Sequence, residues 1–236
     1  MSAQIKVVRH LDPNLAVKTF FADPEWVFKT FIGSTFNALS LLAVALNQAW
    51  TLPLSVLLCA MVCGYMLKVM RSDVSSTARK LPEWRDWVDI IISGLSWIAV
   101  ATGFWLIVLS ILTVSFIVEV VQGSGIAHDP RFITWAVTTF TLVFVVSLFV
   151  SLLTCYLQVN LAQEERMPAA FALRKVTQKF RKKGTEMLEA WLLSIALNSL
   201  AIIIPVCTIF GICLIPVTSF IASTISATML AQAFND

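Results

Sequence analysis

Apolar residues along this chain fall into long uncharged runs separated by short polar stretches. A run of about twenty apolar residues is long enough to cross the hydrocarbon core of a bilayer as a helix. A strict alternation of apolar and polar residues would indicate strands instead. The pattern therefore predicts an all-α membrane protein. The uncharged runs are residues 30–50, 51–67, 90–118, 132–160 and 190–235.

Helix breakers divide these runs into individual spans. The first two runs are separated only by the polar residues 47–48 and by residues 51–53, which end at Pro53. We therefore expect a tight helical hairpin. The last run is too long for one crossing and is interrupted by Pro205, Gly211 and Pro216, which break helices. Splitting it gives a polytopic bundle of six transmembrane helices arranged as three hairpins.

Lys and Arg lie almost entirely on one side of the six predicted spans. With the N-terminus inside, only Arg131 of the 17 Lys and Arg residues lies on the other side. Loops that stay in the cytoplasm are rich in Lys and Arg. The distribution predicts a multi-pass membrane protein with both termini in the cytoplasm.

The chain is expected to contain one membrane domain with short cytoplasmic segments. Residues 1–29 lack an apolar segment followed by a small-residue cleavage site, so they do not read as a signal peptide. We expect them to form a cytoplasmic N-terminal and interfacial segment. Residues 30–236 form the six-span domain, with cytoplasmic loops at 68–89 and 161–189.

A weak repeat precedes the predicted hairpins. Pro24-Glu25-Trp26 stands before the first span and Pro82-Glu83-Trp84 before the third, while a third segment beginning at Pro168 leads into the fifth. We expect each hairpin to be entered through a cytoplasmic amphipathic helix, with Pro82 at its first turn in the second case.

The second of these entry helices carries tryptophans on one face. Trp84 and Trp87 recur at helical spacing with Val88, Ile91 and Leu95. Because indole rings favour the headgroup layer, we predict that Trp84 and Trp87 contact lipid. Alternatively, Glu83, Asp86 and Asp89 form an acidic ion site, although acids in a first helical turn are already favoured by the helix dipole.

The third entry segment predicts a basic amphipathic helix with Leu173, Val176 and Phe180 on its apolar stripe. Anionic lipid headgroups on the cytoplasmic leaflet are the ligand that its charge favours. An acidic partner protein is the alternative, and nucleic acid is disfavoured because the adjacent membrane would compete for the same face. The residues that we expect to bind are Arg174, Lys175, Lys179, Arg181, Lys182 and Lys183.

Composition supports a membrane protein and offers no catalytic site. The chain is 58% hydrophobic and 13% charged, which is about half the charge of an ordinary soluble domain. His10 and His128 fall on opposite sides of the membrane, so no histidine-based catalytic or metal cluster is expected. The predicted spans hold no ionisable residue at mid-membrane depth, which disfavours ion-driven transport. We expect no enzyme activity, no metal and no cofactor.

Two motifs resemble a family of uncharacterised six-span integral membrane proteins of bacteria and archaea. They are the Gly-Tyr-x-x-x-Val-x-Arg motif from Gly64 to Arg71 and the Leu-Pro-Glu-Trp motif from Leu81 to Trp84. The resemblance extends from about Asp23 to the end of the last span. It implies a six-span helical bundle of unknown function in a prokaryotic cytoplasmic (inner) membrane and carries over no catalytic residues.

The sequence leaves three functions open. The first is a non-enzymatic subunit or scaffold of a larger membrane complex, packed against other membrane proteins. The second is a passive or partner-powered permease component for a lipid or small apolar molecule, which a cavity lined by Asn37 and Asn198 would support. The third, an accessory pigment-carrying subunit, lacks intramembrane histidines.

Overall fold

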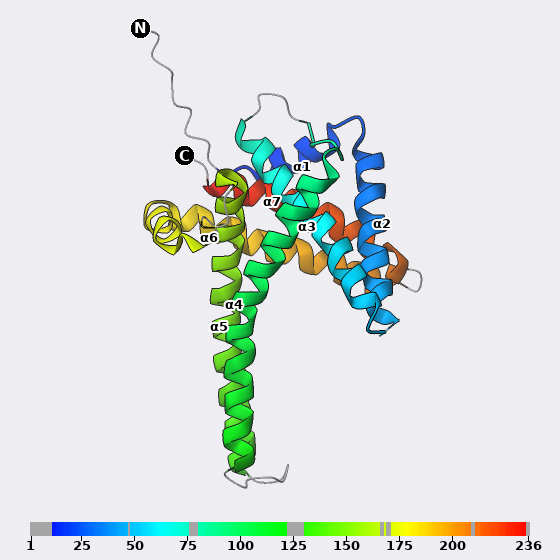
Figure 1. Cartoon of the computed structure of the whole chain (residues 1–236). Coiled ribbons are helices and arrows are strands. Elements are labelled where there is room, and N and C mark those ends of the chain that lie inside the picture. Colours follow the sequence, from blue (N-terminus) through cyan, green and yellow to red (C-terminus); the bar gives the residue numbers. More distant parts are fainter. Residues whose placement is uncertain are drawn as a thin grey trace. The chain divides into compact units, whose positions relative to one another are not determined.

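The computed structural model describes residues 11–46, 48–75, 80–121, 130–165, 168, 171–208 and 211–234. In these ranges six helices are long and apolar enough to cross a membrane, so the predicted all-α, six-span fold is confirmed. The elements in chain order (Figure 1) are α1 Pro13–Phe21, α2 Trp26–Ala45, α3 Thr51–Ser75, α4 Trp87–Val121, α5 Pro130–Glu164, α6 Leu173–Val206, the 3-10 helix η2 Gly211–Leu214 and α7 Ile215–Phe234.

The chain divides into two compact units. The second unit, Ala99–Cys155, consists of the C-terminal part of α4 and the N-terminal part of α5. Many of its large apolar side chains are exposed, including Phe140 and Phe149. Such exposure is costly in water but is what a helix surrounded by lipid requires.

The first unit, Met1–Ile98 with Tyr156–Asp236, is built around α7. This helix packs against α6, α3, α2 and α1, and its residues from Thr224 to Phe234 are all buried. Its sequence there is rich in Ala, Ser and Thr, whose small side chains let neighbouring helix backbones approach closely. Because other helices pack around α7, none of its sides is exposed enough to require a polar face.

Polar side chains join the helices of two predicted hairpins. In α2 and α3 the hydroxyl oxygens of Ser40 and Ser55 lie 3.0 Å apart. In α6 and α7 the Asn198 amide donates to Ser226 Oγ at 2.9 Å, and Ser223 Oγ donates to the Asn198 carbonyl at 3.1 Å. Asn198 thus satisfies both ends of its amide between two helices.

Two glycines bring α3 and α4 into backbone contact. A Cβ atom on Gly64 would lie 1.9 Å from the carbonyl oxygen of Ile90, and one on Gly94 would lie 1.9 Å from that of Ala60. Neither position can carry a side chain unless the helices separate. Gly211 has a similar role in the turn before α7, where a Cβ atom would lie 1.8 Å from the carbonyl oxygen of Pro205.

One predicted helix start is wrong. Residues 81–86 are not helical and α4 begins only at Trp87, so Pro82 does not open an amphipathic helix. The reason is that this segment is held against α2 and α3 by the contacts described below. The third entry segment is helical from Leu173 and forms the first part of α6, which is separated from the fifth span by a kink at the non-helical residue Lys183 (φ −129°, ψ 29°).

Candidate functional site

The first part of α6 separates buried apolar from exposed basic side chains. Val176 is buried, whereas Arg174, Lys175, Arg181 and Lys182 are exposed. The predicted apolar stripe is incomplete, because Leu173 is 43% exposed. The non-helical conformation of Lys183 then redirects the chain, with Gly184 next to it.

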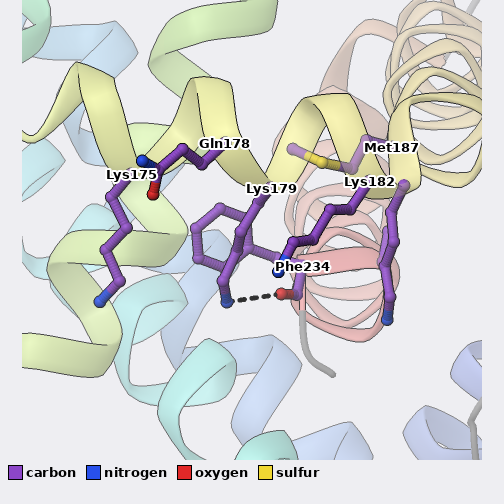
Figure 2. A pocket seen from close by; sticks show the side chains of 8 residues that line it. Lys175, Gln178, Lys179, Lys182, Met187 and Phe234 are labelled. Atoms are coloured by element: carbon purple, nitrogen blue, oxygen red, sulfur yellow. Dashed lines mark hydrogen bonds between the residues drawn. The ribbon is translucent and has the colours of Figure 1, made fainter.

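Four lysines of α6 line one open pocket (Figure 2). Its volume is about 220 Å³, and Met187 with the last turn of α7 completes the lining. In Figure 2 the side chains of Lys175, Lys179 and Lys182 extend from α6 toward the same side. Several ammonium groups around a small space attract phosphate or carboxylate groups. The lining residues are Lys175, Gln178, Lys179, Lys182, Lys183, Met187, Ala233 and Phe234.

Lys179 fixes the basic segment to the end of α7. Its Nζ donates to the backbone carbonyl of Phe234 at 2.9 Å and lies 4.0 Å from the centre of the Phe234 ring. The last carbonyls of a helix lack intrahelical donors and carry partial negative charge, so an ammonium group is favoured there. The pocket therefore combines a charged rim with an aromatic wall.

The other predicted basic residues lie at different places around this pocket. Lys175 forms an ion pair with Glu164 at the end of α5. Lys182 and Lys183 both line the pocket, but Arg174 and Arg181 are not among its lining residues. The structure thus brings together four of the six basic residues singled out in the sequence.

The two predicted tryptophans belong to another part of the first unit and differ from each other. Trp84 is only 8% exposed, so the prediction that it contacts lipid is corrected. Its ring stacks on Tyr65 at 4.0 Å between centroids, and its Nε1 donates to the carbonyl oxygen of Lys29 at 3.2 Å. Trp87 is 42% exposed and keeps a surface that lipid can reach.

A buried ion pair beside Trp84 was not anticipated from the sequence. Lys29 Nζ donates to Asp23 Oδ2 at 2.9 Å and to the carbonyl oxygen of Leu81 at 2.9 Å. Asp23 Oδ2 also accepts from Leu81 N at 2.7 Å. Asp23 is 1% exposed and Lys29 is 5% exposed. The pair therefore ties the start of α2 to the segment that precedes α4.

Hydrogen bonding controls the ionisation of Asp23. Burial raises the pKa of its carboxyl, but the hydrogen bonds from Lys29, Glu25 N and Leu81 N outweigh burial, and the pKa lies below its ordinary value. Because the folded pKa is depressed, the carboxylate stabilises the fold at neutral pH. That contribution is lost as the pH falls from the unfolded value, about 3.9, through the lower folded value.

This linkage gives a pH prediction. We expect Asp23→Asn to have a lower unfolding temperature than the unsubstituted protein at pH 7, and the difference to shrink below about pH 4. Thermal unfolding in detergent micelles, followed by circular dichroism between pH 7 and pH 3, measures it. A difference that stays constant over this range would show that the Asp23 charge does not contribute.

The acids of the 83–89 segment are each paired with a basic side chain. Asp86 lies 3.6 Å from Lys68, Asp89 lies 3.5 Å from Arg71, and Glu83 pairs with Arg85. Arg71 also donates to the carbonyl oxygen of Ala162 in α5 at 2.9 Å. Among the described residues no group of three His, Cys, Asp or Glu side chains is placed to hold a metal ion.

Comparison with known proteins gives one match. A family profile described as "Protein of unknown function (DUF4013)" matches residues 49–215, which is more than half of the chain. The match begins later than Asp23 and ends before most of α7, so it is narrower than the resemblance seen in the sequence. No curated protein and no solved structure matches the chain.

Proposed function

We propose that this chain, which belongs to the DUF4013 family of proteins of unknown function, is a non-enzymatic subunit or scaffold of a larger complex in a prokaryotic cytoplasmic membrane. Both termini would lie in the cytoplasm. The basic part of α6 would bind anionic phospholipid headgroups and so fix the protein at the cytoplasmic surface.

The lysine pocket carries this proposal. Four lysines line one small space, Lys175 pairs with Glu164, and none of the eight lining residues is acidic, so positively charged groups predominate in the lining. Each basic residue near an anionic membrane surface contributes about 1 kcal/mol of binding. Met187 and Phe234 are buried, 0% and 1% exposed, so the lysines are the side chains that a lipid headgroup would reach.

The arrangement of the intramembrane amides supports a scaffold over a permease. Asn198 hydrogen-bonds to Ser226 and Ser223 of α7, and the Asn37 amide approaches the carbonyl oxygen of Pro216 at 3.5 Å. These side chains join helices to each other. A permease would use such groups to contact a substrate.

Neutralising two exposed lysines tests lipid binding. We expect Lys175→Gln with Lys182→Gln to reduce retention of phosphatidylglycerol about tenfold or more, because about 1 kcal/mol is lost per charge. Native mass spectrometry of the protein released from mixed micelles measures the bound lipid. The matched control is Lys18→Gln with Lys80→Gln, two exposed lysines outside the pocket. Equal losses in both double variants would contradict a specific pocket.

The subunit role has its own test. The tagged protein is purified from nanodiscs, and co-purifying proteins, lipids and pigments are identified by mass spectrometry. Stoichiometric recovery of other membrane proteins supports the proposal. Recovery of the chain alone with a retained small molecule contradicts it in favour of the permease.

A further inference from the structure

A second pocket lies where the spans α2 and α4 begin. Four lining residues are the N-cap of α2 and three residues of its first two turns, and the other four belong to residues 83–85 and the first position of α4. Because two candidate spans start here, we expect this pocket to lie at the membrane surface. Its volume is about 320 Å³, at the lower end of the range for ligand pockets of about 300 Å³ upward. The lining residues are Glu25, Phe28, Lys29, Ile32, Glu83, Trp84, Arg85 and Trp87.

This pocket is lined by both acidic and basic side chains, whereas the charged side chains of the lysine pocket are all basic. The Lys29 ammonium is already held by buried Asp23 at 2.9 Å and lies farther, 3.6 Å, from Glu25. The Glu25 side chain is 62% exposed and makes no capping hydrogen bond to α2. Its carboxylate is therefore a negative group whose nearest cation is mostly neutralised by another acid. Arg85, 78% exposed, lies in the same pocket and pairs through Nε with Glu83, and its guanidinium carries further N–H donors that a phosphate can use.

Aromatic rings form another part of the wall. The faces of Trp84 are covered by Tyr65 and by Trp87, whose ring centre lies 5.8 Å away. Trp87 is 42% exposed and Phe28 is 63% exposed, so both rings keep surface that faces outward. An ammonium group near such rings gains from cation–π attraction as well as from the carboxylate.

We propose that this pocket binds the headgroup of a zwitterionic phospholipid that carries a primary ammonium. The ammonium lies at Glu25 between the rings of Trp87 and Phe28, and the phosphate lies at Arg85. A primary ammonium donates hydrogen bonds to the carboxylate, which a choline headgroup cannot do. The pocket is separate from the lysine pocket and selects a lipid without net charge.

Competition between lipids tests this site. The purified full chain is equilibrated in micelles with equal amounts of phosphatidylethanolamine, phosphatidylcholine and phosphatidylglycerol, and native mass spectrometry counts each bound lipid. We expect phosphatidylethanolamine to exceed phosphatidylcholine. Glu25→Gln should lower phosphatidylethanolamine about fivefold and leave phosphatidylglycerol unchanged, since an exposed ion pair is lost while the side-chain shape is kept. Arg85→Gln should lower the same lipid, and Glu189→Gln, an exposed acid of α6 outside both pockets, should not.

Two results would overturn the proposal. Equal retention of phosphatidylethanolamine and phosphatidylcholine would remove the role of the primary ammonium. Equal effects of Glu25→Gln and Glu189→Gln would remove the role of this pocket. The proposed function fails separately, because Lys175→Gln with Lys182→Gln is expected to change phosphatidylglycerol and not phosphatidylethanolamine.

Discussion

Asp23→Ala is expected to lower the free energy of unfolding by about 3–5 kcal/mol, the usual cost of removing one partner from a buried ion pair. The substitution removes the buried counter-charge of the Lys29 ammonium, 5% exposed, and leaves it the more distant Glu25 carboxylate at 3.6 Å, whose side chain is 62% exposed. It also removes the acceptor of Leu81 N. Thermal unfolding in detergent micelles, followed by circular dichroism, measures the loss.

A double substitution that removes both charges tests whether an isolated buried charge causes the loss of stability. We expect Asp23→Leu with Lys29→Leu to recover most of the lost stability, because no isolated charge remains buried. Glu189→Gln serves as a control for loss of an exposed acid. If Asp23→Ala were no more destabilising than this control, the pair would not hold α2 to the segment before α4.

Gly64→Ala and Gly94→Ala are expected to have the second largest effect, each lowering the free energy of unfolding by about 3 kcal/mol. The new Cβ atoms would lie 1.9 Å from backbone carbonyl oxygens of the facing helix, and backbone cannot move aside as a flexible side chain can. The α3 and α4 backbones must separate, and dispersion contacts along the interface are lost. The same unfolding assay, together with the yield of monodisperse protein, measures the effect.

Gly103→Ala is the matched control for this prediction. Apart from the adjacent residues and the nearby backbone of α4 itself, none of the described atoms lies within 4 Å of a Cβ atom placed on Gly103. Alanine in an open helical position stabilises by about 0.8–1 kcal/mol relative to glycine in water. A destabilisation by Gly103→Ala as large as that by Gly64→Ala would mean that the close approach of α3 and α4 is not the cause.

The helices were largely predictable because bilayer thickness imposes a strong pattern on sequence. The apolar runs located the six spans, and Pro205 with Gly211 marked the break before α7. Helix ends were less predictable. Apolar runs stop where water begins, whereas backbone hydrogen bonding continues, so α5 extends to Glu164 and α6 already begins at Leu173.

The candidate site was predictable only where it depends on residues close in sequence. Spacing along α6 identified the lysines that share the first pocket. Gly184, which follows the non-helical Lys183, could have indicated a break in the helix at this point. The burial of the Asp23–Lys29 pair could not be predicted from the sequence, because its third partner, Leu81, is distant in the chain. Trp84 was misplaced for the same reason, since its burial depends on Tyr65 and on the carbonyl of Lys29.

The contact between Asp23 and Leu81 also sets an order of assembly, because these residues are separated by 58 positions. The hairpin of α2 and α3 is complete in sequence at Ser75, before Leu81 is synthesised. During translation the two charges at the start of α2 must therefore remain hydrated at the membrane surface. They become buried only when the next connector arrives, so the first hairpin reaches its final packing only after Leu81 has been synthesised.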